Sequence, residues 1–327
     1  MVSILSAVAA VGEPPSGLQP HGPAAGELVT LWWVLFWLAA VVFVAVTVLL
    51  ALALRGRRDL PLDTDRLTGE GMAGGGNLLT VVGGVAVPGA VVLLLMVLMI
   101  TTGASVRALG NPGADVVVEV TGHKWWWDVR YPEEGVRTAN EIRIPTGRTV
   151  ELRLTSADVI HSFWVPALAG KIDMTPGEET HLRLEAAEPG VHRGLCTEYC
   201  GLQHALMHFV VEAVPAEDFD AWVAARQEPP PEPADAVAQR GLELFEGLDC
   251  VLCHTVDGVS PPTALGPDLT DFGQRLTIGA GVLPNDSEHL AAWVLDPHER
   301  KAGVHMPASP LPDDELAALV AYLETLE

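Results

Sequence analysis

The chain has 327 residues, which is enough for two or three modest domains. Its hydrophobic share of 49% and its mean hydropathy of +0.29 are high for a purely soluble protein and indicate membrane-spanning segments. The formal net charge of −23 excludes nucleic-acid binding through a basic surface, because an acidic surface repels phosphates.

Two apolar runs near the N-terminus are long enough to cross a bilayer, whose core needs about 20 apolar residues in a helix. They cover residues 27–54 and 78–102, and Pro88 is expected to kink the second one. A cleaved signal peptide fits the first run poorly, since that run is too long and no basic segment precedes it. The sequence therefore predicts a two-helix transmembrane hairpin.

Positive charge is concentrated between these two runs. The loop at 55–77 contains four arginines, whereas residues 1–26 contain no Lys or Arg. The positive-inside rule places that loop in the cytoplasm and both termini outside it. We therefore expect a multi-pass protein of the bacterial cell (inner) membrane, with everything after the second run on the extracytoplasmic side.

Beyond the second run, the sequence changes to short β-branched segments and then to helical ones. The segments between 115 and 226 are separated by turns such as Thr-Pro-Gly, which predicts an all-β sandwich or barrel. The Pro-rich stretch 227–235 predicts an extended linker. Residues 236–327 contain several helical runs and predict an all-α domain.

Soft metal ligands are gathered in one stretch of the β region. Cys196, Cys200, His204 and Met207 lie within a dozen residues, and His161 is available upstream. Thiolate, thioether and imidazole together favour copper, and a second thiolate allows two sulfur bridges between two ions. A disulfide, a zinc site of two Cys and two His, and a purely structural methionine are the alternatives.

The second pair of cysteines lies in the helical region and precedes a histidine. Cys250-Val-Leu-Cys253-His254 has the form of a c-type haem attachment motif, in which both cysteines bind the macrocycle and His254 ligates the iron. A thioredoxin-like redox pair or half of a zinc site has the same spacing. The chain has four cysteines in all, so no further pair is left to complete such a zinc site.

The first ligand cluster and its surroundings resemble the CuA domain of cytochrome c oxidase subunit II. The resemblance rests on Cys-x-Glu-x-Cys-x-x-x-His-x-x-Met at 196–207, on Asp-Val-Ile-His-Ser-Phe-Trp-Val-Pro at 158–166 and on Gly-His-Lys-Trp-Trp-Trp at 122–127. It implies a cupredoxin sandwich that holds a binuclear copper A centre. The implied ligands are His161, Cys196, the backbone carbonyl of Glu198, Cys200, His204 and Met207.

The same resemblance implies further roles and also shows departures. The Glu198 side chain would bind a magnesium or manganese ion at the interface with oxidase subunit I, and Trp125 would take up electrons from a separate cytochrome. Lys124 stands where the family commonly has Gln, and Trp126 stands where it commonly has Tyr. Val81 occupies the place of a glutamate that serves a proton path in many relatives, so proton uptake is not part of the prediction.

Residues 236–327 resemble a small class I cytochrome c. The resemblance implies that Met306 is the second axial ligand of one covalently bound haem c, with His305 as the rival by position. It also implies that the Pro267 carbonyl holds the ring of His254. The contact between the first and last helices of such a domain corresponds to Gly241, Phe245 and Tyr322.

Together, these features resemble an oxidase subunit II with a cytochrome c domain fused at its C-terminus. This implies the electron-input subunit of a haem-copper terminal oxidase, a translocase. Electrons would pass from a donor through the haem to copper A and on to subunit I, where O2 is reduced to water with proton translocation. The alternatives are the same kind of subunit in a CuA-type nitric oxide reductase, and a non-enzymatic membrane-anchored electron-transfer or copper-delivery protein.

The expected partners follow from the same resemblance and from charge. They are subunit I, subunit III, the lipid bilayer, and a basic cytochrome c or a neighbouring cytochrome complex as electron donor. Residues 236–327 contain 15 acidic against 4 basic residues, a balance that attracts a basic protein and repels nucleic acid.

Overall fold

The computed structural model describes residues 16–56, 81–108 and 113–327. They belong to two compact units, one formed by Met1–Gly26 with Gly110–Glu327 and the other by Glu27–Leu109. Most of the predicted cytoplasmic loop at 55–77, with three of its four arginines, lies outside the described residues, as does most of the predicted extracytoplasmic segment at 1–26.

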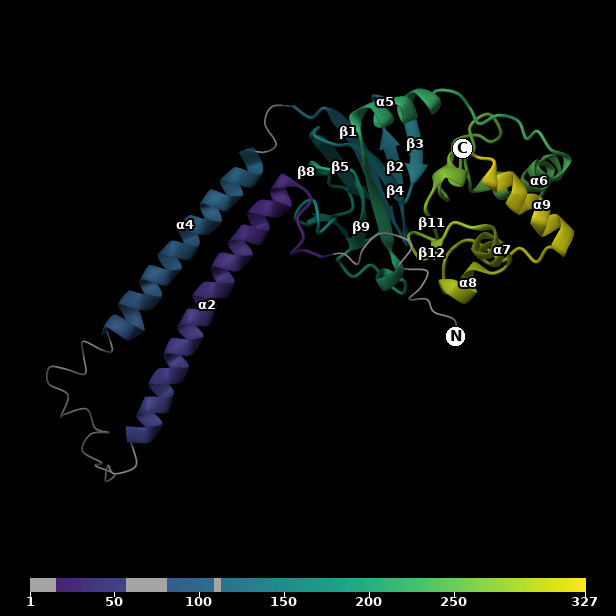
Figure 1. Ribbon diagram of the computed structural model, residues 1–327. Coiled ribbons are helices and arrows are strands. Elements are labelled where there is room, and N and C mark those ends of the chain that lie inside the picture. The colour runs from purple at the N-terminus through teal and green to yellow at the C-terminus, as the bar shows by residue number, and fades with distance from the viewer. Residues whose placement is uncertain (1–15, 57–80, 109–112) are drawn as a thin grey trace. The chain divides into compact units, whose positions relative to one another are not determined.

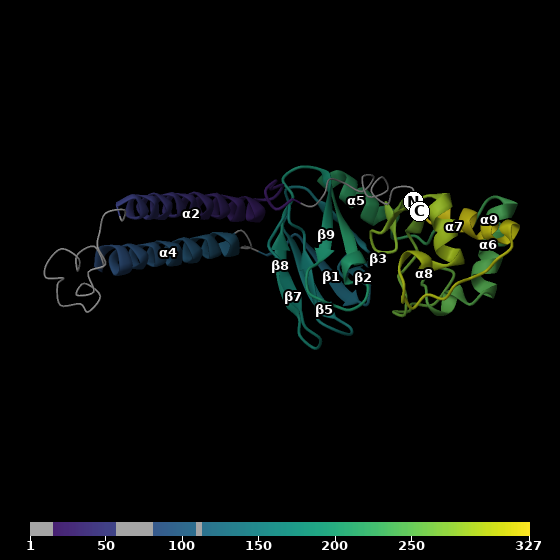
Figure 2. The same cartoon turned by 90° about the horizontal axis from the view of Figure 1, so that it is seen from below.

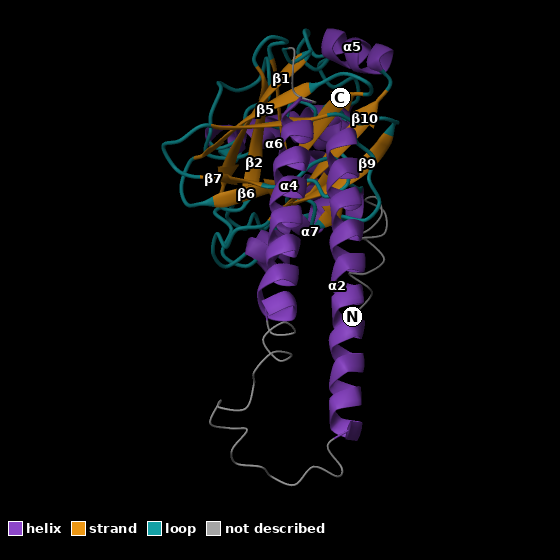
Figure 3. Cartoon of the chain, turned by 90° about the vertical axis from the view of Figure 1, so that its left-hand side faces the viewer, coloured by secondary structure: helices purple, strands orange, loops and turns teal. Residues whose placement is uncertain are grey.

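The two predicted spans correspond to long helices, which Figures 1 and 3 show running alongside each other. The first is α2 (Pro23–Gly56), and the second consists of a π-helical turn, η3 (Val82–Ala86), followed by α4 (Val87–Ala108). Both are long and apolar enough to cross a membrane, and most of their side chains are exposed. The first extends beyond its predicted range at both ends and the second at its C-terminal end, because a helix continues past the apolar stretch that signals it.

The irregular turn η3 directly precedes Pro88. Proline has no N–H to donate and its ring crowds the preceding turn, so a wider turn accommodates it. The sequence predicted a kink at this position, and the described backbone has a local widening there.

The β region forms a sandwich of two mixed sheets (Figure 2), with strand orders β3-β2-β1-β5-β8 and β4-β10-β9-β6-β7. The first sheet consists of β1 (Val116–His123), β2 (Trp126–Tyr131), β3 (Val136–Ala139), β5 (Val150–Ser156) and β8 (Thr180–Leu184). The second consists of β4 (Glu141–Pro145), β6 (His161–Trp164), β7 (Ile172–Met174), β9 (Gly190–Cys196) and β10 (His208–Val214). Within these sheets, β1 pairs parallel with β5 and β10 pairs parallel with β4. The fold is the cupredoxin-like sandwich that the resemblance implied.

The aromatic core of the sandwich contains Trp127, Phe163 and Phe209, all fully buried. The ring of Trp127 lies 5.8 Å from that of Phe163 and 5.0 Å from that of Phe209, both in edge-on geometry. Such packing adds to the free energy gained by burying apolar area. It holds β2, β6 and β10 together, and two of these strands border the predicted copper site.

A helix that the sequence pattern did not predict follows the last strand. In α5 (Ala216–Ala225), Phe219 and Trp222 are buried. Their rings lie 6.2 and 5.2 Å from that of Tyr131 on β2. Burying these aromatic side chains ties the helix to the sandwich.

The C-terminal region is helical, as predicted, and its elements surround a separate apolar core. Its helices are α6 (Ala236–Gly247), α7 (Ser287–Leu295), α8 (Pro297–Arg300) and α9 (Asp313–Glu324), with short turns η5 (Cys250–Leu252) and η6 (Phe272–Gln274) and a small ladder of β11 (Thr277–Ile278) and β12 (Leu283–Pro284). The Asp235 carboxylate accepts hydrogen bonds from two backbone N–H groups at the start of α6 and caps that helix. Asp313 and Asp314 lie in the first turn of α9, where the helix dipole favours negative charge.

The helices α6 and α9 cross at Gly241, which the sequence resemblance had marked for this contact. A Cβ atom on Gly241 would lie 2.0 Å from the Ala318 carbonyl oxygen and 2.6 Å from Tyr322 Cβ. The rings of Phe245 and Tyr322 are 5.6 Å apart beside this crossing. Since the close contact at Gly241 involves backbone, no side-chain rotation can make room.

Gly241→Ala is expected to destabilise the helical domain by about 2 kcal/mol or more, because one helix must move away from the other. Gly247→Ala is the matched control in the same helix, since nothing lies within 4 Å of its Cβ position. That change should be neutral or stabilise by up to about 1 kcal/mol. Denaturant unfolding followed at the haem absorption measures both, and equal midpoints would contradict the crossing.

Candidate copper and haem sites

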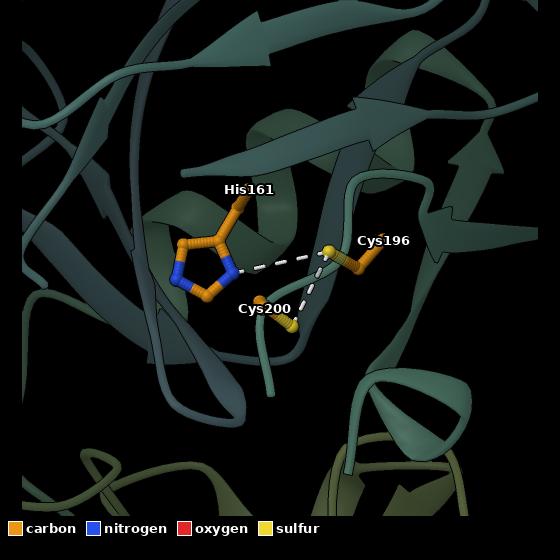
Figure 4. A group of neighbouring side chains, drawn as sticks. All are labelled: His161, Cys196 and Cys200. Carbon is orange, nitrogen blue, oxygen red and sulfur yellow. Dashed lines mark hydrogen bonds between the residues drawn. The ribbon is translucent and has the colours of Figure 1, made fainter. Parts of the chain in front are cut away.

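Three of the predicted copper ligands converge at one end of the second sheet (Figure 4). His161 begins β6, Cys196 ends β9, and Cys200 lies in the loop that follows. The Cys196 sulfur lies 3.8 Å from His161 Nδ1 and 3.8 Å from the Cys200 sulfur. All three side chains are buried, so the cluster is shielded from water.

The other three groups implied by the resemblance lie around the same two sulfurs. The Cys200 sulfur is 3.6 Å from His204 Nδ1 and 3.7 Å from Met207 Sδ. The carbonyl oxygen of Glu198 is 3.3 Å from the Cys196 sulfur. The donor set therefore contains two cysteine sulfurs, two imidazoles, a thioether and a carbonyl.

This donor set bears on the alternatives that the sequence left open. Both cysteines are free, and their sulfurs are too far apart for a disulfide bond of about 2.05 Å. The Met207 sulfur, in a fully buried side chain, lies next to a thiol, and a thioether ligand favours copper over zinc. The residues present therefore fit copper.

Two residues orient the His161 ring. The Asp158 carboxylate lies 2.8 Å from His161 Nε2, so that nitrogen donates its proton and Nδ1 is left with a lone pair facing Cys196. A Cβ on Gly122 would lie 2.9 Å from the ring, so a glycine is needed there. Burial alone would raise the pKa of Asp158, but hydrogen bonds from His161, Val159 N–H and Lys124 N–H hold that pKa below its ordinary value.

The pKa values of the Cys196 and Cys200 thiols depend on each other. Hydrogen bonding from Cys200, with a further hydrogen bond to His161, lowers the pKa of Cys196, and the hydrogen bond with Cys196 together with burial raises the pKa of Cys200. The pocket therefore favours loss of the proton from Cys196 first. Since thiolate is the form that binds metal, the pocket is partly prepared for a soft cation.

The three neighbouring tryptophans have different surroundings. Trp127 is fully buried in the sandwich core, and Trp126 stacks on His123 with ring centroids 4.3 Å apart. Trp125 is half-buried, and its indole N–H donates to the Cys200 carbonyl at 3.1 Å. Trp125 is thus the tryptophan of this segment that is bonded to the loop carrying the copper ligands.

The side chain of Glu198 is half-buried, and its Oε1 accepts a hydrogen bond from the Tyr199 N–H at 3.2 Å. Among the described residues, the His161, Cys196 and Cys200 cluster is the one group of three or more His, Cys, Asp or Glu side chains placed to hold a metal. A magnesium or manganese ion at Glu198 would need ligands from another chain.

The haem motif lies in a tight turn at the end of α6. Cys250 begins η5, and the His254 N–H donates to the Cys250 carbonyl at 2.9 Å. His254 Nδ1 lies 2.8 Å from the Pro267 carbonyl oxygen, which is the contact that the resemblance implied for this proline. That bond keeps the proton on Nδ1 and leaves Nε2 for iron. A Cβ on Gly266 would lie 3.0 Å from the His254 ring, so this ring also rests against a glycine.

Both cysteines of this motif are free, and Cys253 is exposed, so it is accessible for covalent attachment. Burial lowers the pKa of His254 despite the Pro267 hydrogen bond, and this direction favours the neutral ring that binds a metal. These observations fit a covalently attached haem. Met306 is half-buried and His305 is exposed, which favours Met306 as the inward-facing side chain.

A membrane-anchored, two-domain redox protein is the class that this fold and these sites define. Residues 134–214 match the family model described as the periplasmic domain of cytochrome c oxidase subunit II, and residues 238–327 match the cytochrome c family. The matches to these two domain models imply copper A and haem as cofactors.

Curated relatives match the chain over a longer stretch than either family model does. The chain is 45% identical to cytochrome c oxidase subunit 2 of Alkalihalophilus pseudofirmus, over 65% of this chain and 61% of that protein. It is 36% identical to the subunit 2 of a Bacillus species, strain PS3, over 68% and 67% respectively. The chain thus spans about two thirds of the length of these relatives. It belongs to the cytochrome c oxidase subunit 2 family.

A solved structure also resembles part of the chain. The periplasmic domain of cytochrome oxidase subunit II from Bradyrhizobium japonicum is 31% identical, with a TM-score of 0.34, and the match covers 36% of this chain and 96% of that one.

Proposed function

We propose that this chain is the electron-input subunit of a haem-copper terminal oxidase that reduces O2 to water and translocates protons. The convergence of five side chains carries the proposal: His161, Cys196, Cys200 and Met207 are buried, and the half-buried His204 lies 3.6 Å from the Cys200 sulfur. The oxygen-reducing site would lie in subunit I. The family membership supports this role, since the named relatives are oxidase subunits.

In the proposed protein, a binuclear copper A centre is held by those five side chains and the Glu198 carbonyl, and Cys250, Cys253, His254 and Met306 hold one haem c. When bound, these two cofactors would supply one-electron redox chemistry, with the haem as electron donor to copper and copper as donor to subunit I. Asp158 and Pro267 keep the two ligating imidazoles in the correct tautomer. The buried pocket excludes water, so the copper ligands do not rearrange around solvent.

The proposal extends to orientation and partners. Both termini and both redox domains would be extracytoplasmic, and the helices α2 and η3-α4 would anchor them in the cell membrane. The Glu198 side chain would share a magnesium or manganese ion with subunit I, and subunit III would complete the complex. No role in proton uptake is proposed for this subunit, since Val81 occupies the place of the glutamate that serves a proton path in many relatives.

Purification of the native membrane complex tests the proposed reaction. We expect a large multi-span haem subunit to co-purify, with rapid O2 consumption and slow or absent NO reduction by the same sample. Faster reduction of NO than of O2 would assign the chain to a nitric oxide reductase instead. Recovery of the chain without any haem subunit would favour a free-standing electron-transfer or copper-delivery protein.

Because residues 236–327 form an acidic domain, the rate at which a basic cytochrome c reduces this chain should depend on salt. Raising the ionic strength from about 0.01 M to 0.15 M shortens the Debye length from about 30 to about 8 Å. We expect the second-order rate of reduction by a basic cytochrome c to fall by about tenfold or more, because steering is screened. An acidic cytochrome is the control and should show no such fall. A flat response with the basic donor would contradict docking on this surface.

A further inference from the structure

The loop that carries the copper ligands lies directly against the helical domain. We call residues 200–204 the copper loop. The Gln203 amide N–H, from a buried side chain, donates to the Ala302 carbonyl at 2.5 Å. A Cβ on Gly303 would lie 3.0 Å from Leu202 Cδ2, so the backbone at Gly303 also approaches this loop closely. The segment 301–303 therefore contacts the copper loop three residues before Met306.

Lys301 is the second connection between the two domains, and it is 1% exposed. Its ammonium donates to the Trp125 carbonyl and to the Gly279 carbonyl, at 2.8 Å each. The first acceptor belongs to the cupredoxin domain and the second to the helical domain. Burial lowers the pKa of Lys301 to about 7, which shows how unfavourable the site is for a charge without a carboxylate partner.

Trp125 links these two connections to the copper ligands. Its carbonyl accepts a hydrogen bond from the Lys301 ammonium, while its indole N–H donates to the Cys200 carbonyl at 3.1 Å. Gly201, with φ +114°, turns the copper loop so closely that a Cβ there would lie 3.2 Å from the indole ring. A continuous path of covalent and hydrogen bonds thus joins the segment before Met306 to a copper ligand.

We propose that Lys301 and Gln203 are positioning residues for electron transfer inside this chain, holding segment 301–306 against Trp125 and the copper loop. This inference rests on the proposed function. The step moves one electron from the ferrous haem, which becomes ferric, to the copper pair, which is reduced by one electron, and no bond forms or breaks. Electron tunnelling slows steeply when a bonded path is broken or lengthened. The segment covers the Trp125 backbone, so a separate cytochrome would reduce the haem domain and not Trp125.

The test is the rate of haem-to-copper transfer in the purified holo-complex after flash photoreduction of the haem by a ruthenium complex. Lys301→Met keeps the apolar stem and removes the ammonium, and Gln203→Met keeps the length and removes the N–H. We expect each change to slow the transfer on the order of tenfold, as a small displacement of aligned groups does. Amide hydrogen exchange in 301–306 should become faster, while the haem and near-infrared copper spectra stay unchanged.

Thr138→Val is the matched control, because it removes a different bond between the same domains. The Thr138 hydroxyl donates to Asp271 at 3.1 Å and accepts from Arg275 at 3.2 Å, away from the copper loop. Its transfer rate should equal that of the unaltered chain. Equal rates in Lys301→Met and the unaltered chain would overturn the inference, as would an equal slowing by Thr138→Val. If the unaltered complex shows no haem-to-copper transfer, the proposed function itself fails.

Discussion

Cys196→Ser is expected to remove the copper pair and to lower the rate of oxygen consumption by two or more orders of magnitude. The Cys196 sulfur lies within 3.8 Å of His161, Cys200 and the Glu198 carbonyl, so this one atom connects both halves of the ligand set. A hydroxyl is a hard, weakly acidic ligand and cannot replace a bridging thiolate for copper. Copper content per chain and near-infrared absorption measure the loss.

The neighbouring Thr197 provides the control for that substitution. Its buried hydroxyl has no hydrogen-bond partner in the structure, so Thr197→Val keeps the shape of the side chain without leaving another group unpaired. We expect this variant to retain its copper and its near-infrared absorption. Unchanged copper content and absorption in Cys196→Ser would show that the copper assignment is wrong.

Met306→Leu is expected to change the axial ligation of the haem while leaving it covalently attached. Loss of the thioether should lower the haem reduction potential by on the order of 0.1 V, a fraction of the roughly 0.8 V range that axial ligands span. Reduction of the haem by its electron donor should slow, because a lower haem potential decreases the driving force of that step. Redox titration and the absorption band that arises from sulfur ligation of the iron provide the measurement.

His305→Gln tests the rival ligand at the neighbouring position. His305 is exposed, whereas Met306 is half-buried, so we expect the histidine variant to keep the parent potential and the sulfur band. A change in His305→Gln, with no change in Met306→Leu, would make His305 the ligand.

Both sites could be predicted because most of their ligands lie close together in the sequence. The stretch 196–207 contains most of the predicted copper ligands within a dozen residues, and the haem motif supplies three groups within five, so short-range sequence determines which atoms can meet. His161 was predicted as an available second imidazole, and the resemblance implied it as a ligand. The structure brings it to Cys196 because β6 pairs with β9, with Phe163 opposite Cys196.

The contacts that position those ligands were not predictable in the same way. Lys301 and Trp125 are 176 residues apart in the sequence, and Gln203 and Ala302 are 99 apart, so no local pattern relates them. Asp158 belongs to the motif at 158–166, but its hydrogen bond to His161 was not predicted, because it depends on the backbone turn between the two residues.

Some elements of the fold were missed for physical reasons. The strand β2 lies in a Trp-rich segment in which Trp127 is fully buried, and the alternation of polar and apolar residues that indicates a strand is weak there. The helix α5 is only ten residues long, and its signals, Pro215 before the first turn and two acidic residues within it, lie next to the Pro-rich stretch.

Rapid mixing of the native complex with a reduced basic cytochrome c, under anaerobic conditions, tests the central claim of electron input most directly. The haem c absorption, the near-infrared copper absorption and the haem absorption of subunit I are followed together. We predict that haem c is reduced first, the copper pair second and the subunit I haem third. Reduction of the subunit I haem at its full rate while the copper absorption stays unchanged, as in a Cys196→Ser complex with normal turnover, would contradict the account.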